Sequence, residues 1–146
     1  DEAIYGLPCH ADKVLKIVPR TGEISTFGEL GPQEWKYHGG NNVNGKIYCI
    51  PQKALRVMVI DPLTSTVYYI GEEYPGICKW YGGILGKADG KVYGMPQNAG
   101  GVLQIDPVSE MTTVLGSFPE GGHKWHGGLA DTSGAIFAVP ANADTV

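Results

Sequence analysis

The sequence predicts an all-β protein built as an array of repeated units, each with four antiparallel strands. Three similar stretches recur along the chain: KYHGGNNVNGKIYCIP at 36–51, KWYGGILGKADGKVYGMP at 79–96 and KWHGGLADTSGAIFAVP at 124–140. The chain holds 22 Gly and 10 Pro in 146 residues, which leaves almost no room for helices of useful length. Its apolar runs are short, rich in β-branched and aromatic residues, and separated by turn-forming residues about every 8 to 12 positions, as strands are.

These repeats organise the chain as one domain. In register, the units run over 4–46, 47–91 and 92–135, and a partial fourth unit covers 136–146. A spacing of about 44 residues is characteristic of repeat architectures whose neighbouring units bury a shared core. With 42% hydrophobic and 18% charged residues, the composition is that of a folded globular protein.

The first two strands of each unit form a predicted hairpin. In the last copy they are KWHGGL from Lys124 and AIFAVP from Ala135, joined through Ser133-Gly134. Asn44-Gly45 and Asp89-Gly90 stand at the same place in the other copies. Pairs of this kind favour a two-residue turn in which both residues have positive φ, so we expect all three hairpins to be tight.

The third and fourth strands follow the hairpin. The third is VLQI at 102–105, with VMVI and VLKI as counterparts, and the fourth is TTVLG, VYYIG or ISTFG. The third strand ends at Asp61-Pro62 or Asp106-Pro107, where the carboxylate caps the turn and proline withholds a backbone donor. We therefore interpret Asp61 and Asp106 as structural residues that form turns.

A gradient in composition orders the four strands in space. The first carries paired glycines, which are kept where another backbone comes close, as where inner strands converge on an axis. The second is apolar on both faces and fits between sheets, whereas the fourth alternates with Ser and Thr and fits a solvent-facing edge. Radial sheets of this kind are the blades of a β-propeller. The glycines are Gly39, Gly40, Gly82, Gly83, Gly127 and Gly128.

The combination KWxGG…DGxIYGxP…VLxIDP resembles the repeats of uncharacterised propeller-like proteins from algae and other eukaryotic microbes, and the resemblance covers the whole chain. It implies a β-propeller fold and no particular activity. The Trp-Asp dipeptide of one common blade class and the Gly, Tyr and Trp spacing of kelch blades are both missing from the sequence.

The number of blades raises the question of how the array is completed. Propellers close with about four to eight blades, whereas this chain supplies three units and part of a fourth, beginning and ending on a second strand. Open strand edges of that kind pair with other chains. We expect the partner to be further blades of a longer chain, a second copy that closes a six-bladed ring, or copies joined head to tail in an open array.

Each first strand opens with a recurring Lys and a recurring aromatic residue, and both are candidate ligand-binding positions. The lysines would form a cationic ring that holds a carboxylate, sulfate or phosphate, or they would bond backbone carbonyls. The aromatic side chains would stack on sugar rings, or they would fill the wedge between blades. In both sets the second interpretation is favoured. The lysines are Lys36, Lys79 and Lys124, and the aromatic residues are Tyr37, Trp80 and Trp125.

A third recurring position holds His38, Tyr81 and His126, which are also candidate ligand-binding residues. A metal site is not expected, because the tyrosine interrupts the pair of histidines. In addition His123, three residues before His126, would lie on the opposite face of a strand. We expect no cofactor.

The three cysteines do not indicate zinc, because Cys9, Cys49 and Cys78 form no C-x-x-C pair. In an oxidising compartment they would give one disulfide and an odd thiol, and otherwise they would be buried and inert.

Charge and patterning exclude several classes of function. The net charge is −4 and basic residues do not cluster, so no nucleic-acid partner is expected. The longest aliphatic run, 57–60, is far shorter than the roughly 20 residues of a membrane span. The chain has no Gly-x-Ser-x-Gly motif, and catalysis needs one asymmetric constellation rather than three copies of the same residues, so we expect that it is not an enzyme.

The sequence therefore predicts a non-enzymatic scaffold or interaction module, completed by further blades or by copies of itself. The alternative is a multivalent, lectin-like module that binds glycans through the recurring aromatic and Lys positions. A start without Met, few Lys, many Gly and Thr and an odd cysteine favour an extracellular, secreted protein.

Overall fold

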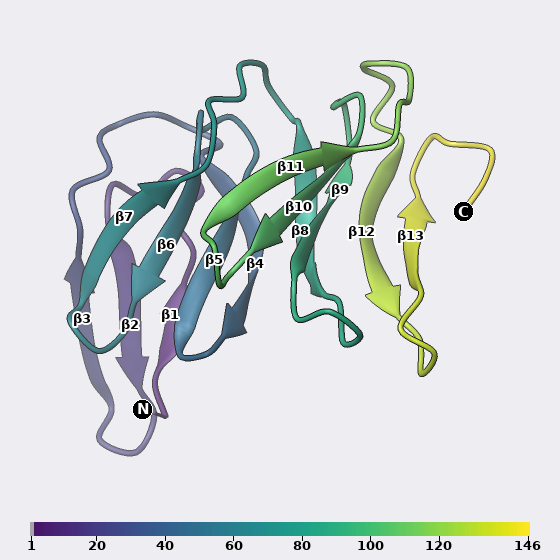
Figure 1. Ribbon diagram of the computed structural model, residues 1–146. Helices are drawn as coiled ribbons and strands as arrows, with labels where there is room; N and C mark the ends of the chain where they lie inside the picture. The colour runs from purple at the N-terminus through teal and green to yellow at the C-terminus, as the bar shows by residue number, and fades with distance from the viewer. Residues whose placement is uncertain (1) are drawn as a thin grey trace.

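The computed structural model describes residues 2–146, and within that range the chain forms thirteen β-strands and no helix. Each strand runs antiparallel to its hydrogen-bonded neighbours. The strands form four sheets that stand side by side in chain order (Figure 1). The prediction of an all-β array of antiparallel sheets is confirmed.

The sheets differ in how many strands they contain. The first holds β1 (Ile4–Gly6), β2 (Val14–Val18) and β3 (Glu23–Phe27). The second holds β4 (Tyr37–Val43), β5 (Lys46–Pro51), β6 (Val57–Asp61) and β7 (Thr66–Ile70). The third holds β8 (Trp80–Leu85), β9 (Val92–Pro96), β10 (Val102–Asp106) and β11 (Met111–Leu115). The last holds β12 (Trp125–Ala130) and β13 (Ile136–Pro140).

The two end sheets are incomplete in complementary ways. By comparison with the four-stranded middle sheets, the first sheet lacks its innermost strand and the last sheet lacks its third and fourth strands. Within the described residues, β1 and β13 therefore each carry a strand edge with no hydrogen-bonded neighbour.

The core lies between the sheets and not within any one of them. Because side chains alternate across a strand, β5 and β6 present apolar residues to both faces of the second sheet. One buried cluster joins the second and third sheets: Tyr48, Ile50, Val57, Val59, Ile70, Trp80, Val92, Leu103 and Ile105. Another joins the first and second sheets: Val14, Tyr37, Cys49, Ala54, Met58 and Ile60.

The paired glycines let the inner strands touch through their backbones. A Cβ atom built on Gly39 would lie 2.7 Å from Gly82 Cα, and one built on Gly83 would lie 2.9 Å from Gly40 Cα. The first glycine of each pair also has positive φ, 79° at Gly39, 68° at Gly82 and 77° at Gly127. Each pair coincides with a β-bulge in the pairing of the first strand with the second. At Gly39 and Gly83 only glycine fits without moving the backbone of the neighbouring inner strand.

The prediction of a tight two-residue turn is confirmed for one hairpin and wrong for the other two. Asn44 and Gly45 have φ of 52° and 81°, and they join β4 to β5 through the pair Val43 and Lys46. At Asp89-Gly90 and Ser133-Gly134 only the glycine has positive φ. These two copies carry longer loops, in which the side chain of Asp89 or Asp131 accepts backbone hydrogen bonds. The extra loop residues replace the two-residue turn by a carboxylate-capped one.

The Asp-Pro pairs stand where the third strands of the complete sheets end. Asp61 Oδ1 accepts hydrogen bonds from the backbone N–H of Leu63 and Thr64, at 2.9 and 3.4 Å. Asp106 Oδ1 accepts them from Val108 and Ser109, at 2.9 and 3.2 Å. These bonds lower the pKa of Asp106 below its ordinary value.

We expect Gly39→Ala to lose about 1–3 kcal/mol more stability than Gly127→Ala. Both residues have positive φ, so both variants carry the same backbone strain. Only Gly39 faces a neighbouring backbone, since nothing in the described chain lies within 4 Å of a Cβ built on Gly127. Urea denaturation of the two variants measures the difference, and equal losses would contradict close packing of the inner strands.

Candidate functional site

The candidate residues stand together at the start of the inner strands β4, β8 and β12. Each group is preceded by a residue with positive φ that is not glycine: Trp35 at 56°, Cys78 at 50° and His123 at 47°. Non-glycine residues in this region cost about 1 kcal/mol or more and gather at functional sites. The same turn therefore recurs before each of these three inner strands.

The three lysines do not form a cationic ring. Lys36 and Lys79 are 2% and 5% exposed, and each ammonium donates hydrogen bonds to backbone carbonyls instead. Lys79 Nζ bonds Gln52 O at 3.1 Å, Ala54 O at 3.0 Å and Gly76 O at 3.3 Å. Because Gln52 and Ala54 follow β5, this lysine ties the third sheet to the second. Lys36 bonds the carbonyls of His10, Gly31 and Gln33, and Lys124 bonds those of Pro119 and Gly121.

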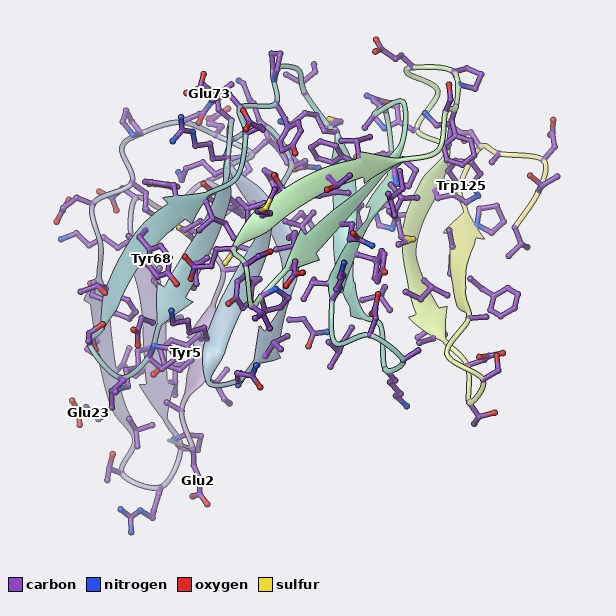
Figure 2. The ribbon with its side chains drawn as sticks, viewed as in Figure 1. Glu2, Tyr5, Glu23, Tyr68, Glu73 and Trp125 are labelled. Atoms are coloured by element: carbon purple, nitrogen blue, oxygen red, sulfur yellow. The ribbon has the colours of Figure 1, made fainter. Side chains whose placement is uncertain are left out.

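The recurring aromatic side chains lie in the wedges between sheets. Tyr37 and Trp80 belong to the two buried clusters, and burial raises the pKa of Tyr37. Trp80 Nε1 donates to Gly101 O at 2.8 Å, and Trp125 Nε1 donates to Thr145 O at 3.0 Å. Figure 2 labels Trp125 beside the C-terminal segment that it contacts. At 2% exposure Trp80 offers no ring face to a sugar.

The third recurring position brings His38, Tyr81 and His126 together in a stack, here called the inner column. The ring centroid of Tyr81 lies 3.7 Å from that of His38 and 3.5 Å from that of His126, at interplanar angles of 25° and 30°. The tyrosine that interrupts the histidines in the sequence is thus the middle of the stack. Burial, and secondarily the charge of His126, lowers the pKa of His38.

A cavity of about 450 Å³, here called the inner pocket, opens beside the inner column. His123 and His126 both line it, although their spacing in the sequence predicts that they lie on opposite faces of a strand. That prediction is wrong because His123 precedes β12, in a turn that changes the direction of the chain. The pocket is lined by Trp35, His38, Gln52, Lys53, Ile77, Cys78, Tyr81, Gln97, His123 and His126.

Three buried polar atoms at the inner pocket have no hydrogen-bond partner within residues 2–146: His38 Nδ1, Gln52 Oε1 and Gln97 Oε1. Gln52 and Gln97 are 4% and 8% exposed. Neither glutamine is among the site residues predicted from the sequence, although a Pro-Gln pair stands at the end of the second strand in two copies, at 51–52 and 96–97. Buried polar groups are nearly always paired, so this cluster indicates a place for a bound molecule.

No group of three or more His, Cys, Asp or Glu side chains among the described residues could hold a metal ion. Cys9, Cys49 and Cys78 are free thiols, and burial raises the pKa of Cys49.

No helix in the described chain is long and apolar enough to cross a membrane.

Comparisons with known proteins place the fold and not the family. No protein-family model and no curated protein sequence matches the chain. Virginiamycin B lyase from Staphylococcus aureus matches with a TM-score of 0.77 and 16% identity, over 96% of this chain and 46% of the lyase. An auxiliary nutrient binding protein from Bacteroides ovatus matches with a TM-score of 0.68 and 10% identity, over 95% of this chain and 33% of that one.

A further match is the extracellular domain of a one-component system from B. thetaiotaomicron, with a TM-score of 0.61 and 13% identity, over 88% of this chain and 19% of that one. The neighbours have β-propeller-like folds, so the expected fold class is supported, whereas the KWxGG repeat motif remains a resemblance. The chain spans less than half the length of each of these proteins.

The expectation that the chain is not an enzyme does not stand. It depended on the repetition of the sequence, yet an enzyme, virginiamycin B lyase, has this fold. A repeated scaffold can carry one asymmetric site because equivalent positions hold different residues, as His38, Tyr81 and His126 do in the inner column.

Lys79 makes the stability of the chain depend on pH. Burial lowers its pKa from 10.5 to about 8, so the unfolded chain binds more protons between these values and stability rises with pH there. We expect the unfolding free energy of the native chain, minus that of Lys79→Met, to rise by up to about 1.4 kcal/mol per pH unit across that window. Denaturation at several pH values measures it, with exposed Lys87→Met as the control. A flat difference would show that Lys79 titrates normally.

Proposed function

We propose that the chain is a β-propeller segment that binds a small molecule in the inner pocket. The observation that carries the proposal is that His38, Gln52 and Gln97, each with a buried and unpaired polar atom, all line one cavity. Leaving such an atom unpaired costs about 1–3 kcal/mol, and a ligand that pairs it recovers that energy. The volume of about 450 Å³ lies within the usual range for small-molecule sites.

The fold of the neighbours supports ligand handling by this scaffold. A catalytically inactive variant of virginiamycin B lyase was crystallised with quinupristin, and another neighbour is a nutrient binding protein. Small-molecule binding replaces the lectin-like alternative, because Tyr37 and Trp80 are covered by neighbouring sheets and Trp125 is only 9% exposed. An extracellular location remains part of the proposal, supported by the neighbour that is an extracellular domain.

A fragment screen by NMR tests the site. With a library of small ring-containing acids, amides and amines, we expect hits to shift the side-chain amide signals of Gln52 and Gln97. Gln97→Leu removes one unpaired acceptor and should weaken those hits at least about tenfold, which corresponds to 1.4 kcal/mol. Gln33→Leu, on an exposed loop residue that does not line the inner pocket, serves as the matched control. Hits that shift neither the Gln52 nor the Gln97 side-chain amide signals would overturn the proposal.

The sequence also predicts that the chain associates with further blades or copies of itself, and we place this association at the end of the array formed by the last sheet. A cavity of about 830 Å³ lies between the third and last sheets, lined by apolar residues such as Leu115, Phe118 and Phe137. Leu115 is 38% exposed, whereas its counterpart in the second sheet, Ile70, is 6% exposed. The third sheet, which has four strands, covers the second sheet. The last sheet, which has only two, leaves part of the third sheet uncovered, and the cavity lies where a third and a fourth strand of the last sheet would stand. We propose that further propeller strands fill it, supplied by a second copy when the chain is alone.

Light scattering tests this association. We expect the isolated chain to have a mass larger than one copy, because open apolar strand edges recruit other chains. Phe137→Asp puts a charge into the cavity and should shift the mass toward a single chain, whereas Val108→Asp, exposed and outside it, should not. A native mass of one copy would contradict self-association.

A further inference from the structure

We infer that the ligand of the inner pocket is a small aromatic carboxylate. This inference rests on the proposed function and adds the chemical class of the ligand. Three features of the pocket wall favour this class: its charge, the hydrogen-bond donors that it can present, and the rings that border it.

Among the residues that the structure describes, the wall of the inner pocket holds one lysine and no carboxylate, although the chain as a whole is acidic. None of its lining residues in the described chain is an Asp or Glu, whereas Lys53 and three histidines belong to it. The net charge of the whole chain is −4. Within residues 2–146 the Lys53 ammonium forms no ion pair and no side-chain hydrogen bond. An unpaired cation in a partly enclosed cavity attracts an anion more strongly than one in open water.

The unpaired atoms can become donors to such an anion. A glutamine amide presents either its oxygen or its two N–H groups after a rotation of the terminal torsion, and His38 Nδ1 donates when it carries a proton. Gln52 and Gln97 occupy equivalent places after β5 and β9, so their amides approach the pocket from neighbouring sheets. Two amides, one imidazole and one ammonium supply the hydrogen-bond donors that a carboxylate requires.

The rings at the pocket favour an aromatic group on the ligand. The inner column presents His38, Tyr81 and His126 to the cavity, and Trp35 lines it with 49% of its surface exposed. Flat rings prefer offset-stacked or edge-on contacts with other rings, and such contacts add to the energy of burial. A ring the size of benzoate fits within the volume of the pocket.

Binding of an anion should couple to protonation of His38. Burial and the charge of His126 lower the pKa of His38 in the free chain, with Tyr81 packed against both imidazoles. Lys53 and His123 also line the cavity, and burial, with the charge of Cys9 as the smaller cause, raises the pKa of Tyr81. A bound carboxylate stabilises the imidazolium form, so it raises the pKa of His38 and binds more tightly as the pH falls through that value.

Three ring compounds of similar size separate the classes of ligand: benzoate, benzamide and benzylammonium. NMR titration of the full chain, followed on the Gln52 and Gln97 side-chain amides, should show benzoate binding at least about tenfold more tightly than the other two. Lys53→Met should weaken benzoate severalfold and leave benzamide unchanged, whereas Lys87→Met should change neither. With benzoate bound, the pH titration of the His38 imidazole should move to higher pH.

The outcomes distinguish the inference from the function beneath it. If benzamide or benzylammonium shifts the same amides with equal or higher affinity, the carboxylate class is wrong and the binding function stands. If benzoate binds but Lys53→Met has no effect and the His38 titration does not move, benzoate is not recognised by charge and the inference fails. If no probe shifts the glutamine amides, while the fragment screen also finds no hit there, both the inference and the proposed function are overturned.

Discussion

Close contact between the backbones of the inner strands is the constraint on which the rest of the structure depends. At Gly39 and Gly83 there is no room for a side chain, because the backbone of the neighbouring inner strand occupies the space. Strands that lie this close at one edge hold their sheets face to face, and the apolar residues of β5 and β6 then meet those of the flanking sheets. The core between sheets is therefore a consequence of the glycine contacts at the inner edge.

The same convergence creates the site. Residues about 44 positions apart in the sequence come within stacking distance only because their strands share one edge. Tyr81 then lies between His38 and His126, and the residues that follow β5 and β9, namely Gln52, Lys53 and Gln97, place polar groups beside the column. The carbonyl bonds of Lys36 and Lys79 fix those turns against the preceding sheet. The buried lysines therefore help to position the side chains that line the pocket.

Much of the fold is predictable from the sequence, because strand type follows local composition. The paired glycines, the apolar second strands and the Asp-Pro turns each act over a few residues, and the order of the strands follows from them. The longer loops at Asp89 and Ser133 were not predicted, because Asp-Gly and Ser-Gly are ordinary residue pairs for a two-residue turn. These loops differ from the Asn44-Gly45 turn in length and not in the type of residue pair.

The site is less predictable, because it is made of differences between repeats. Recurrence indicates Lys79 and Trp80, which are buried structural members of the repeat, and also the position of His38, Tyr81 and His126, which line the pocket. Gln52 and Gln97 recur only twice and Tyr81 breaks a pattern, and these residues line the pocket. Which rings stack depends on the distance between neighbouring inner strands, and that distance cannot be predicted from the sequence of a single repeat.

The most direct test of this account is a measurement of proton–proton nuclear Overhauser effects among the three rings of the inner column. With centroids 3.7 and 3.5 Å apart, the ring protons of Tyr81 should give strong effects to the imidazole protons of both His38 and His126. Observation of both would establish that three separate repeats meet at one inner edge. If Tyr81 gave no effect to either histidine in a folded sample, the inner strands would not converge as described, and the pocket built on them would not exist.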